Sequence, residues 1–221
     1  MNSIAPEEGF TKEAVGYYRD LQERIIKAFE EVDGGGKFER TDWTREPGHR
    51  LKGGGYMRLL RGKVFEKGGV NVSHVWGTAS EQGMAQMPGA KESGGRFAAC
   101  GISLVTHMHS PFVPTVHMNL RCIATSKMWF GGGADLTPYY PFDEDAVHFH
   151  KTCQNALSPF GEVYYPRFKK WCDEYFFLKH RTEARGIGGV FFDDFTELGF
   201  DKSFSLMKSV GDAFLEAYGP I

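Results

Sequence analysis

The sequence predicts an α+β fold in which an antiparallel β-sheet carries helices on both of its faces. Two observations lead to this prediction. Apolar and polar residues alternate in stretches such as residues 97–108 and 114–123, which is the period of a half-buried strand. Around these stretches, apolar residues recur every three or four positions, which is the period of an amphipathic helix. The 221 residues suit one domain, residues 1–221.

The first quarter of the chain predicts a helix followed by irregular structure. Residues 11–32 place apolar side chains at helical spacing, and the glycines at 34–36 end the predicted helix. Residues 34–55 are polar and rich in glycine, so we expect a loop or a ragged strand. Residues 56–77 alternate and predict strands, with Gly68-Gly69 as the turn between them.

The middle of the chain predicts two neighbouring strands. Residues 78–95 are small and polar, and we expect them to be mobile. A strand over residues 97–108 follows, and Pro111 and Pro114 then separate it from a central strand at 114–123, as in a hairpin with a loose connection. Two adjacent strands would thereby each present a histidine, His107 and His117, towards the same space.

The C-terminal part predicts three helices and one strand. A helix begins near Pro141 and runs to about Leu157, with acidic residues in its first turn. A second helix begins near Pro166 and is expected to reach about Ala184. A strand with a glycine-rich start follows at 187–193, and a last helix covers about 202–218.

Composition argues against several classes of partner. The net charge is −2 and the sequence pI is about 6.5, so nucleic acid is not expected as a partner. No stretch approaches the roughly 20 apolar residues of a transmembrane helix, so none is expected. The first ten residues have neither a signal-peptide core nor an arginine-rich transit pattern, and we expect a cytoplasmic protein. The four cysteines form no C-x-x-C pair, which argues against an iron–sulfur cluster or a cysteine-based zinc site.

The central strand carries the strongest functional signal. On one face it places Thr115, His117, Asn119 and Arg121 in a row, whereas the alternate positions are apolar. An arginine fork suits a carboxylate, and a histidine can move a proton near neutral pH. After three glycines comes Asp135, which is either a turn residue or a carboxylate aimed at N–H donors. The competing interpretation is an ordinary sheet with one face in water.

Four of the eight histidines are candidates for a shared metal site. They are His107, His117, His150 and His180. Their spacings match no tight metal-binding motif, and the alternative is that each is a separate hydrogen-bonding residue.

Five long motifs resemble the oxygen-dependent coproporphyrinogen III oxidases, and the resemblance covers the chain from Gly9 onward. The motifs are V-F-E-K-G-G-V-N-V-S-H-V-W-G, W-F-G-G-G-A-D-L-T-P-Y-Y, D-A-V-H-F-H-K-T, Y-P-R-F-K-K-W-C-D-E-Y-F-F-L-K-H-R and R-G-I-G-G-V-F-F-D-D-F. The resemblance implies a homodimer whose subunits have a broad antiparallel sheet with helices on both faces. It also implies oxidative decarboxylation of two propionates of coproporphyrinogen III to vinyl groups, with O2 as acceptor and no organic cofactor, giving protoporphyrinogen IX.

The resemblance also assigns roles to particular residues. His117 matches the family's proton donor, and Asp135 matches a carboxylate that engages the pyrrole N–H groups. Four positions match substrate contacts: Ser103, Asn119, Leu120 and Arg121. The four histidines, His107, His117, His150 and His180, match ligands of a divalent metal, with Mn²⁺ as one candidate.

The resemblance leaves one departure and two alternative functions. The family continues for roughly another quarter of its length beyond the last predicted helix, so we expect this chain to lack a C-terminal segment. The first alternative is a non-catalytic tetrapyrrole-binding module, and the second is a metal-dependent hydrolase that uses the four histidines. Neither alternative requires O2, which separates both from the oxidase.

Overall fold

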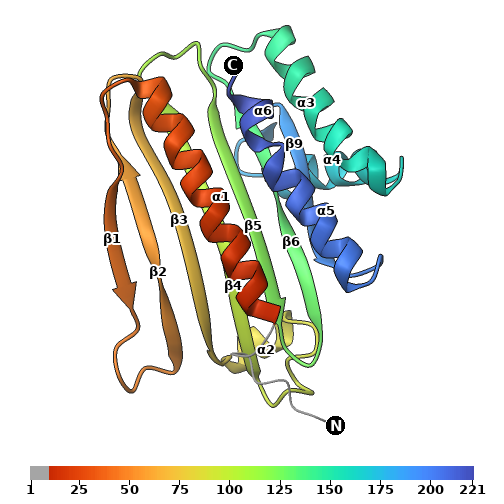
Figure 1. The fold of residues 1–221 in the computed structure, drawn as a ribbon. Helices are drawn as coiled ribbons and strands as arrows, with labels where there is room; N and C mark the ends of the chain where they lie inside the picture. Colours follow the sequence, from red (N-terminus) through yellow and green to blue (C-terminus); the bar gives the residue numbers. More distant parts are fainter. Residues whose placement is uncertain (1–9) are drawn as a thin grey trace.

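The computed structural model describes residues 10–221, which form one large antiparallel sheet with helices packed on it (Figure 1). The predicted α+β class with an antiparallel sheet is confirmed. The expectation that residues 1–10 lack a targeting signal falls almost entirely outside the described part. None of the helices within residues 10–221 is long and apolar enough to cross a membrane.

The sheet has seven strands in the order β1-β2-β3-β4-β5-β6-β9, and each neighbouring pair is antiparallel. The first six follow one another in sequence, and β9 joins the edge of β6 after a long helical excursion. Their bounds are β1 Glu39–Thr44, β2 Leu51–Leu60, β3 Phe65–Thr78, β4 Arg96–Met108, β5 Thr115–Ala124, β6 Met128–Thr137 and β9 Gly188–Phe195. A separate small hairpin consists of β7 Phe177–Leu178 and β8 Glu183–Ala184.

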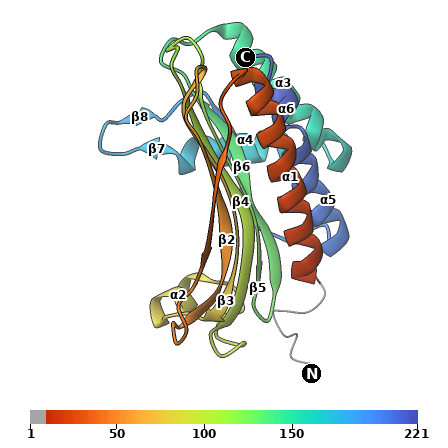
Figure 2. The same ribbon diagram turned by 60° about the vertical axis from the view of Figure 1, so that its left-hand side comes forward.

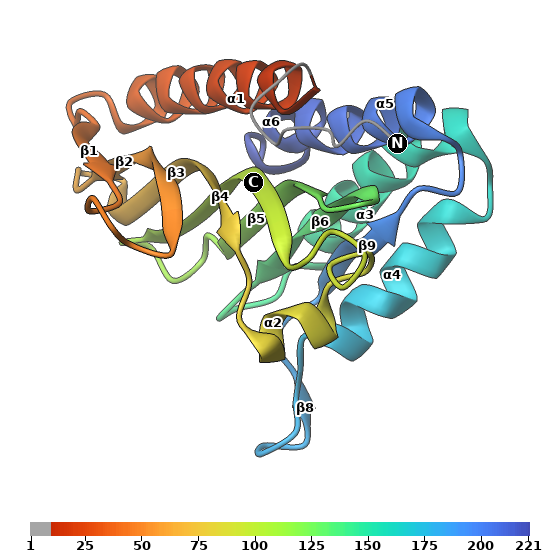
Figure 3. The ribbon, with the colours of Figure 1, turned by 90° about the horizontal axis from the view of Figure 1, so that it is seen from below.

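The helices cover the two faces of the sheet unequally (Figures 2 and 3). Four of them lie on one face: α1 Phe10–Asp33, α3 Asp143–Leu157, α5 Phe200–Asp212 and α6 Phe214–Tyr218. The short helix α2, Glu81–Gln86, lies on the opposite side, where the β7–β8 hairpin also projects. Helix α4, Tyr164–Tyr175, packs along β9 at the edge. Much of the second face is therefore left open by the described residues.

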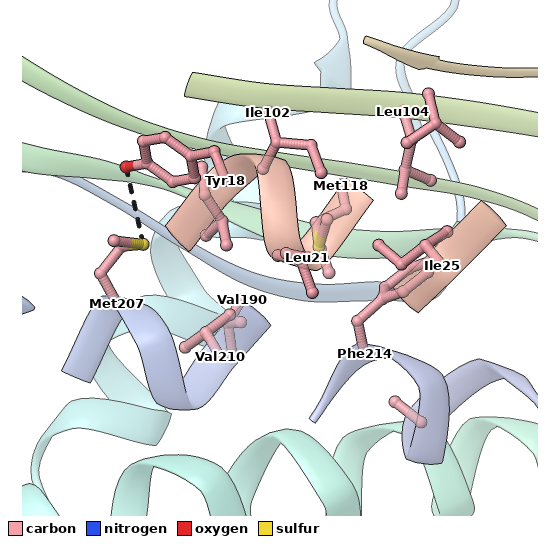
Figure 4. Close-up of a cluster of buried hydrophobic side chains, with 14 of the residues drawn as sticks. Tyr18, Leu21, Ile25, Ile102, Leu104, Met118, Val190, Met207, Val210 and Phe214 are labelled. Carbon is pink, nitrogen blue, oxygen red and sulfur yellow. Dashed lines mark hydrogen bonds between the residues drawn. The ribbon is translucent and has the colours of Figure 1, made fainter. Parts of the chain in front are cut away.

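The hydrophobic core fills the space between the sheet and the helices that cover one of its faces (Figure 4). Helix α1 contributes a stripe at spacings of three and four, and β5 contributes every second residue, as predicted. Gln22, a buried polar residue in the α1 stripe, donates to the carbonyls of Val70 at 2.8 Å and Tyr56 at 3.4 Å. The labelled core residues are Tyr18, Leu21, Ile25, Ile102, Leu104, Met118, Val190, Met207, Val210 and Phe214.

A buried carboxylate fixes the end of α1 to the sheet. Asp33, the last residue of α1, is 4% exposed and accepts four backbone N–H bonds of 2.7–3.2 Å. The donors are Gly36 and three consecutive residues at the β2–β3 turn, 63–65. Burial opposes ionisation, but these four bonds outweigh it and lower the pKa of Asp33 to about 2.

Several predicted boundaries are corrected. Of the two alternatives for residues 34–55, a loop or a ragged strand, the structure has strands: β1 and the start of β2 lie there. The turn expected at Gly68-Gly69 lies instead at residues 61–64, because these glycines pair with β2 on one side and β4 on the other. Residues 78–95 contain α2 and a series of turns, and their expected mobility stays a prediction. The helix expected to reach Ala184 ends at Tyr175.

Candidate active site

The polar face of β5 lies on the more open side of the sheet. Thr115, His117, Asn119 and Arg121 are half-buried there, while the alternate residues are buried beneath the helices, so the predicted alternation is confirmed. Ser103 of β4 lies directly opposite Asn119 in the register. Leu120 was also expected to contact substrate, but its side chain does not lie on this face. That side chain is fully buried on the helix-covered face, because strand residues alternate between faces.

His117 and Asp135 form a hydrogen-bonded pair across two strands. They are register partners in β5 and β6, and His117 Nδ1 lies 2.8 Å from Asp135 Oδ1. A carboxylate only accepts, so Nδ1 carries the proton and Nε2 is left as the site that can take or give one. The Asp135 side chain is 2% exposed, so it lies beneath the site, supporting His117.

Arg185 is a site residue that the sequence analysis missed. Its Nη2 donates to Asp135 Oδ2 at 2.6 Å, so Asp135 holds two partners. Its guanidinium also stacks 3.6 Å from the ring centroid of Phe176, which meets His117 edge-on at 5.6 Å. The sequence analysis predicted a helix up to Ala184 and no hairpin, so it did not place Arg185, which follows the β7–β8 hairpin, near His117. An arginine immediately before the glycine-rich start of β9 was the available signal.

Arg121 lies in a second ion pair at the other end of the same face. Its Nη2 donates to Asp193 Oδ2 of β9 at 2.5 Å, and its Nη1 donates to Asn119 Oδ1 at 3.0 Å. The Arg121 guanidinium also lies 5.9 Å from the ring centroid of Phe191. Asp193 was not identified from the sequence, although an acidic pair within an apolar strand was visible as D-D.

A cavity of about 180 Å³ connects these groups. The polar side chains provide one wall, the β6 glycines part of the floor, and aromatic rings the remainder. The lining residues are His117, Asn119, Arg121, Gly132, Gly133, Tyr175, Phe176, Arg185 and Phe191. Arg121 and His117 therefore line one cavity, whereas Asp135 contributes through the side chains that it holds.

The four candidate metal ligands lie on four different elements. His107 is at the end of β4 with Nδ1 3.3 Å from Thr115 Oγ1, on the same sheet face as His117 but one diagonal step away. His150 of α3 lies between Tyr165 Oη, 3.1 Å from Nδ1, and the Ile187 carbonyl, 3.0 Å from Nε2. His180 is exposed in the turn between β7 and β8, because α4 ends before it.

No shared metal site is visible around these histidines. Within residues 10–221 there is no group of three or more His, Cys, Asp or Glu side chains that could hold a metal. Both ring nitrogens of His150 already have protein partners. The residues in this arrangement do not fit a four-histidine metal centre.

The cysteines are not placed to act as nucleophiles. All four are free and buried. Burial raises the pKa of the Cys153 thiol to about 12. Burial also raises the pKa of the Cys172 thiol, and the nearby Asp135 and Asp173 carboxylates raise it further. A thiol of that kind is protonated near neutral pH and unreactive.

Comparison with known protein families gives one match that spans nearly the whole chain. The model of a family described as coproporphyrinogen III oxidase matches residues 13–221. The matched region contains every strand of the large sheet and every residue that lines the cavity.

Proposed function

Because the chain belongs to the coproporphyrinogen III oxidase family, we propose that the β5 cavity is where its oxidative decarboxylation takes place. The protein is an oxidoreductase of porphyrin and haem biosynthesis. It converts two propionates of coproporphyrinogen III to vinyl groups, with O2 as acceptor. Each turnover balances as R–CH2–CH2–COOH + O2 → R–CH=CH2 + CO2 + H2O2. The proposal rests mainly on the linked His117–Asp135–Arg185 group beside an arginine that can bind a carboxylate.

Arg121 and Asn119 are proposed to hold a substrate propionate. A guanidinium binds a carboxylate through two parallel N–H bonds, and an amide can add a third. Arg121 is four residues from His117, which is about 13 Å along a strand. A propionate anchored at Arg121 is therefore well separated from the ring that lies against His117. This separation suits catalysis, because an ion pair on the departing carboxylate would stabilise a charge that decarboxylation removes.

His117 is proposed to move the proton. With Nδ1–H bound to Asp135, Nε2 can accept the pyrrole N–H proton, which raises the electron density of the ring for its reaction with O2. The buried Asp135 carboxylate fixes the tautomer and stabilises the imidazolium that forms. Arg185 balances the charge of the buried Asp135 carboxylate.

Aromatic rings are proposed to keep water away from the reacting carbon atoms. Phe176, Phe191 and Tyr175 line the same cavity as His117, and the Tyr175 and Phe191 rings stack with centroids 4.1 Å apart. An apolar wall of this kind admits O2 and shields a carbanion-like ring from protonation by solvent.

The cavity accommodates only part of the substrate. About 180 Å³ is less than the roughly 300–1,000 Å³ of a site that encloses a whole small-molecule ligand. We infer that the reacting pyrrole and the propionate held by Arg121 enter the cavity and that the rest of the macrocycle lies over the open face of the sheet. Ser103, opposite Asn119 on that face, lies where it can contact this outer part.

Three further properties are proposed without a structural test. No organic cofactor is expected. Because the four histidines do not fit a shared metal centre, we derive no step through a metal. We also propose a homodimer, which is supported by strand β1, whose outer edge has no partner strand within residues 10–221. We further propose a cytoplasmic location, which is supported by the four free cysteines. Sedimentation velocity and cell fractionation test these two points.

One assay tests the function against its alternatives. Coproporphyrinogen III is incubated aerobically and anaerobically, each with and without a chelator, and vinyl product and H2O2 are measured. We expect product only with O2, unaffected by the chelator. Binding without product under all conditions would favour the tetrapyrrole-binding module. A chelator-sensitive hydrolysis that continues without O2 would favour the metal-dependent hydrolase.

A further inference from the structure

The substrate-binding arginine is already occupied by the protein itself. Both terminal nitrogens of the Arg121 guanidinium are engaged, Nη1 by Asn119 and Nη2 by the Asp193 carboxylate. A propionate needs two adjacent N–H groups for a bidentate bond. Each terminal nitrogen keeps a second N–H, but a propionate bound there would share the guanidinium with the Asp193 carboxylate.

The backbone is shaped around this internal ion pair. At the β6–β9 edge the register shifts, so that Asp193 and Asp194 together lie opposite Gly131. Asp194 has a φ of 50°, the left-handed conformation, and its N–H donates to Asp193 Oδ1 at 3.0 Å. A bulge of this type redirects a side chain, and here it holds the Asp193 carboxylate towards Arg121.

Gly131 leaves the space that the pair fills. A Cβ at this position would lie 2.3 Å from Asp193 Oδ1 and 3.0 Å from Arg121 Nε. The glycine, the bulge and the N–H bond from Asp194 are three separate features that accommodate one contact between Arg121 and Asp193.

We propose that Asp193 is an internal substitute for a substrate propionate: it holds Arg121 in the free protein and is displaced when the propionate binds. This inference rests on the proposed role of Arg121 in propionate binding. Asp193 rather than Asn119 is displaced, because two carboxylates on one guanidinium repel each other whereas the neutral amide does not. Asp193 is thus a positioning residue that lowers the affinity for carboxylates and keeps Arg121 oriented.

The size of the effect follows from competition. A ligand that must first break an internal contact binds more weakly, because only the fraction of protein in which that contact is open can bind it. Arg121 and Asp193 are 28% and 31% exposed, and a partly exposed ion pair of this kind makes a modest contribution. Removing the charge of Asp193 should therefore lower the dissociation constant of a propionate-bearing macrocycle by about two- to fivefold.

The test uses Asp193→Asn, which keeps an oxygen acceptor for the Asp194 N–H and removes only the charge. The probe is coproporphyrin III, whose fluorescence reports binding and which carries four propionates, compared with its tetramethyl ester in detergent. We expect tighter binding of the acid, no change for the ester, and a KM for coproporphyrinogen III that falls while kcat does not rise. Unchanged or weaker binding of the acid, or a raised KM, would overturn the proposal.

Two further variants make the result specific. Glu197→Gln removes the carboxylate partner of Arg167 near the same strand, away from the cavity, and should leave binding unchanged. In an Arg121→Gln background, Asp193→Asn should give no further tightening, since the two residues act through one contact. Should Asp193→Asn not fold, Asp193→Ser also retains an acceptor for the Asp194 N–H, and the same binding shift is expected.

The design separates failure of this inference from failure of the site assignment. If Arg121→Gln alone leaves coproporphyrin binding unchanged, Arg121 does not bind a propionate and both proposals fall. If Arg121→Gln weakens binding but Asp193→Asn does not strengthen it, only the role of Asp193 falls.

Discussion

Asp135 connects two basic side chains while almost all of its own surface is buried. Replacing it by asparagine keeps the shape and removes the charge that His117 and Arg185 share. We expect Asp135→Asn to lower kcat/KM by about 30- to 1,000-fold, corresponding to about 2–4 kcal/mol of lost transition-state stabilisation. Steady-state kinetics checks this, with the melting temperature expected to change little because Arg185 can turn towards solvent.

The control for Asp135→Asn is Asp212→Asn, which breaks a surface pair with Arg24 far from the cavity. It should leave kcat/KM within about twofold of the wild type. If Asp135→Asn kept full turnover and only lowered the melting temperature, Asp135 would be a structural residue and the proton-transfer proposal would fail.

Asp33 makes stability depend on pH in the acid range. Its pKa is lowered to about 2 in the folded protein, against a usual value of 3.8, so the ionised form is favoured by folding. This contribution is fully present above about pH 4 to 5 and is lost as the pH falls through 4 towards 2. Denaturant unfolding at several pH values should show a steeper acid loss for the wild type than for Asp33→Asn.

The Asp33→Asn variant also tests whether the four backbone bonds lower the pKa of Asp33. The variant should also be less stable at pH 7, by about 1–3 kcal/mol, because N–H groups at the β2–β3 turn lose a charged acceptor. Parallel pH profiles for the two proteins would show that the four bonds to Asp33 do not lower its pKa.

Single residues on the central strand were predictable because alternation needs no knowledge of tertiary contacts. His117, Asn119 and Arg121 were placed on one face from period alone. Arg185 and Asp193 were not predicted, because their roles depend on β9 pairing with β6. No local pattern in the sequence states which strand takes the edge beside β6.

At the scale of elements, β6 shows how tertiary pairing overrides local preference. Gly131 to Gly133 suggested a turn, since glycine is depleted in strands. They lie inside β6 instead, and the turn is at residues 125–127. The connection between β5 and β6 is thus a short hairpin, with the Ser126 hydroxyl donating to the Gly89 carbonyl at 2.9 Å.

Gly132 should tolerate no side chain. Its φ is 142°, and a Cβ would lie 2.0 Å from the Asn119 carbonyl oxygen of the paired strand. We expect Gly132→Ala to destabilise the protein by about 3 kcal/mol or to prevent folding, because the clash is with backbone. Denaturant unfolding measures this, with Gly69→Ala of β3 as the control, where a Cβ meets only Asn71 Nδ2 at 3.8 Å. Equal stability of the two variants would refute the steric argument.

Helix α4 and the segment after it show the other limit of sequence patterns. The apolar and aromatic spacing continues past Tyr175, but Phe177 and Leu178 pair with Glu183 and Ala184 in a hairpin. Phe176 is thereby free to pack against His117 and Arg185. The end of the helix is what builds the cavity wall, and a periodicity argument could not locate it.

For the whole molecule, the separation of the four histidines predicts the response to metal removal. They lie on β4, β5, α3 and the β7–β8 turn, without a shared ligand group in residues 10–221. We expect elemental analysis to find substoichiometric metal and EDTA dialysis to leave kcat/KM unchanged. His180→Ala, at an exposed turn, should stay within about twofold of the wild type. One bound metal per chain, lost together with activity in His180→Ala, would restore the four-histidine hypothesis.

The class of fold was predictable from the sequence, whereas its asymmetry was not. Alternation and helical periods were enough to expect an antiparallel sheet with helices, because each pattern requires a face to bury. Which face a helix covers depends on connections, and here α1, α3, α5 and α6 share one face. The cavity lies on the opposite face, so the covered face supplies stability and the open face is available to ligand.

The strand order also bears on the order of events during folding. β1 to β6 each pair with the next strand in the chain, but β9 reaches β6 only across the roughly 50 residues of loop and helix between them. Closing that long connection costs more chain entropy than forming the hairpins, so we expect β9 to dock late. Both cavity ion pairs, Asp135–Arg185 and Arg121–Asp193, join residues that this last step brings together. Pulse-labelled hydrogen exchange should find amides of β3 to β5 protected before those of β9; a nascent chain would then remain inactive until β9 had left the ribosome.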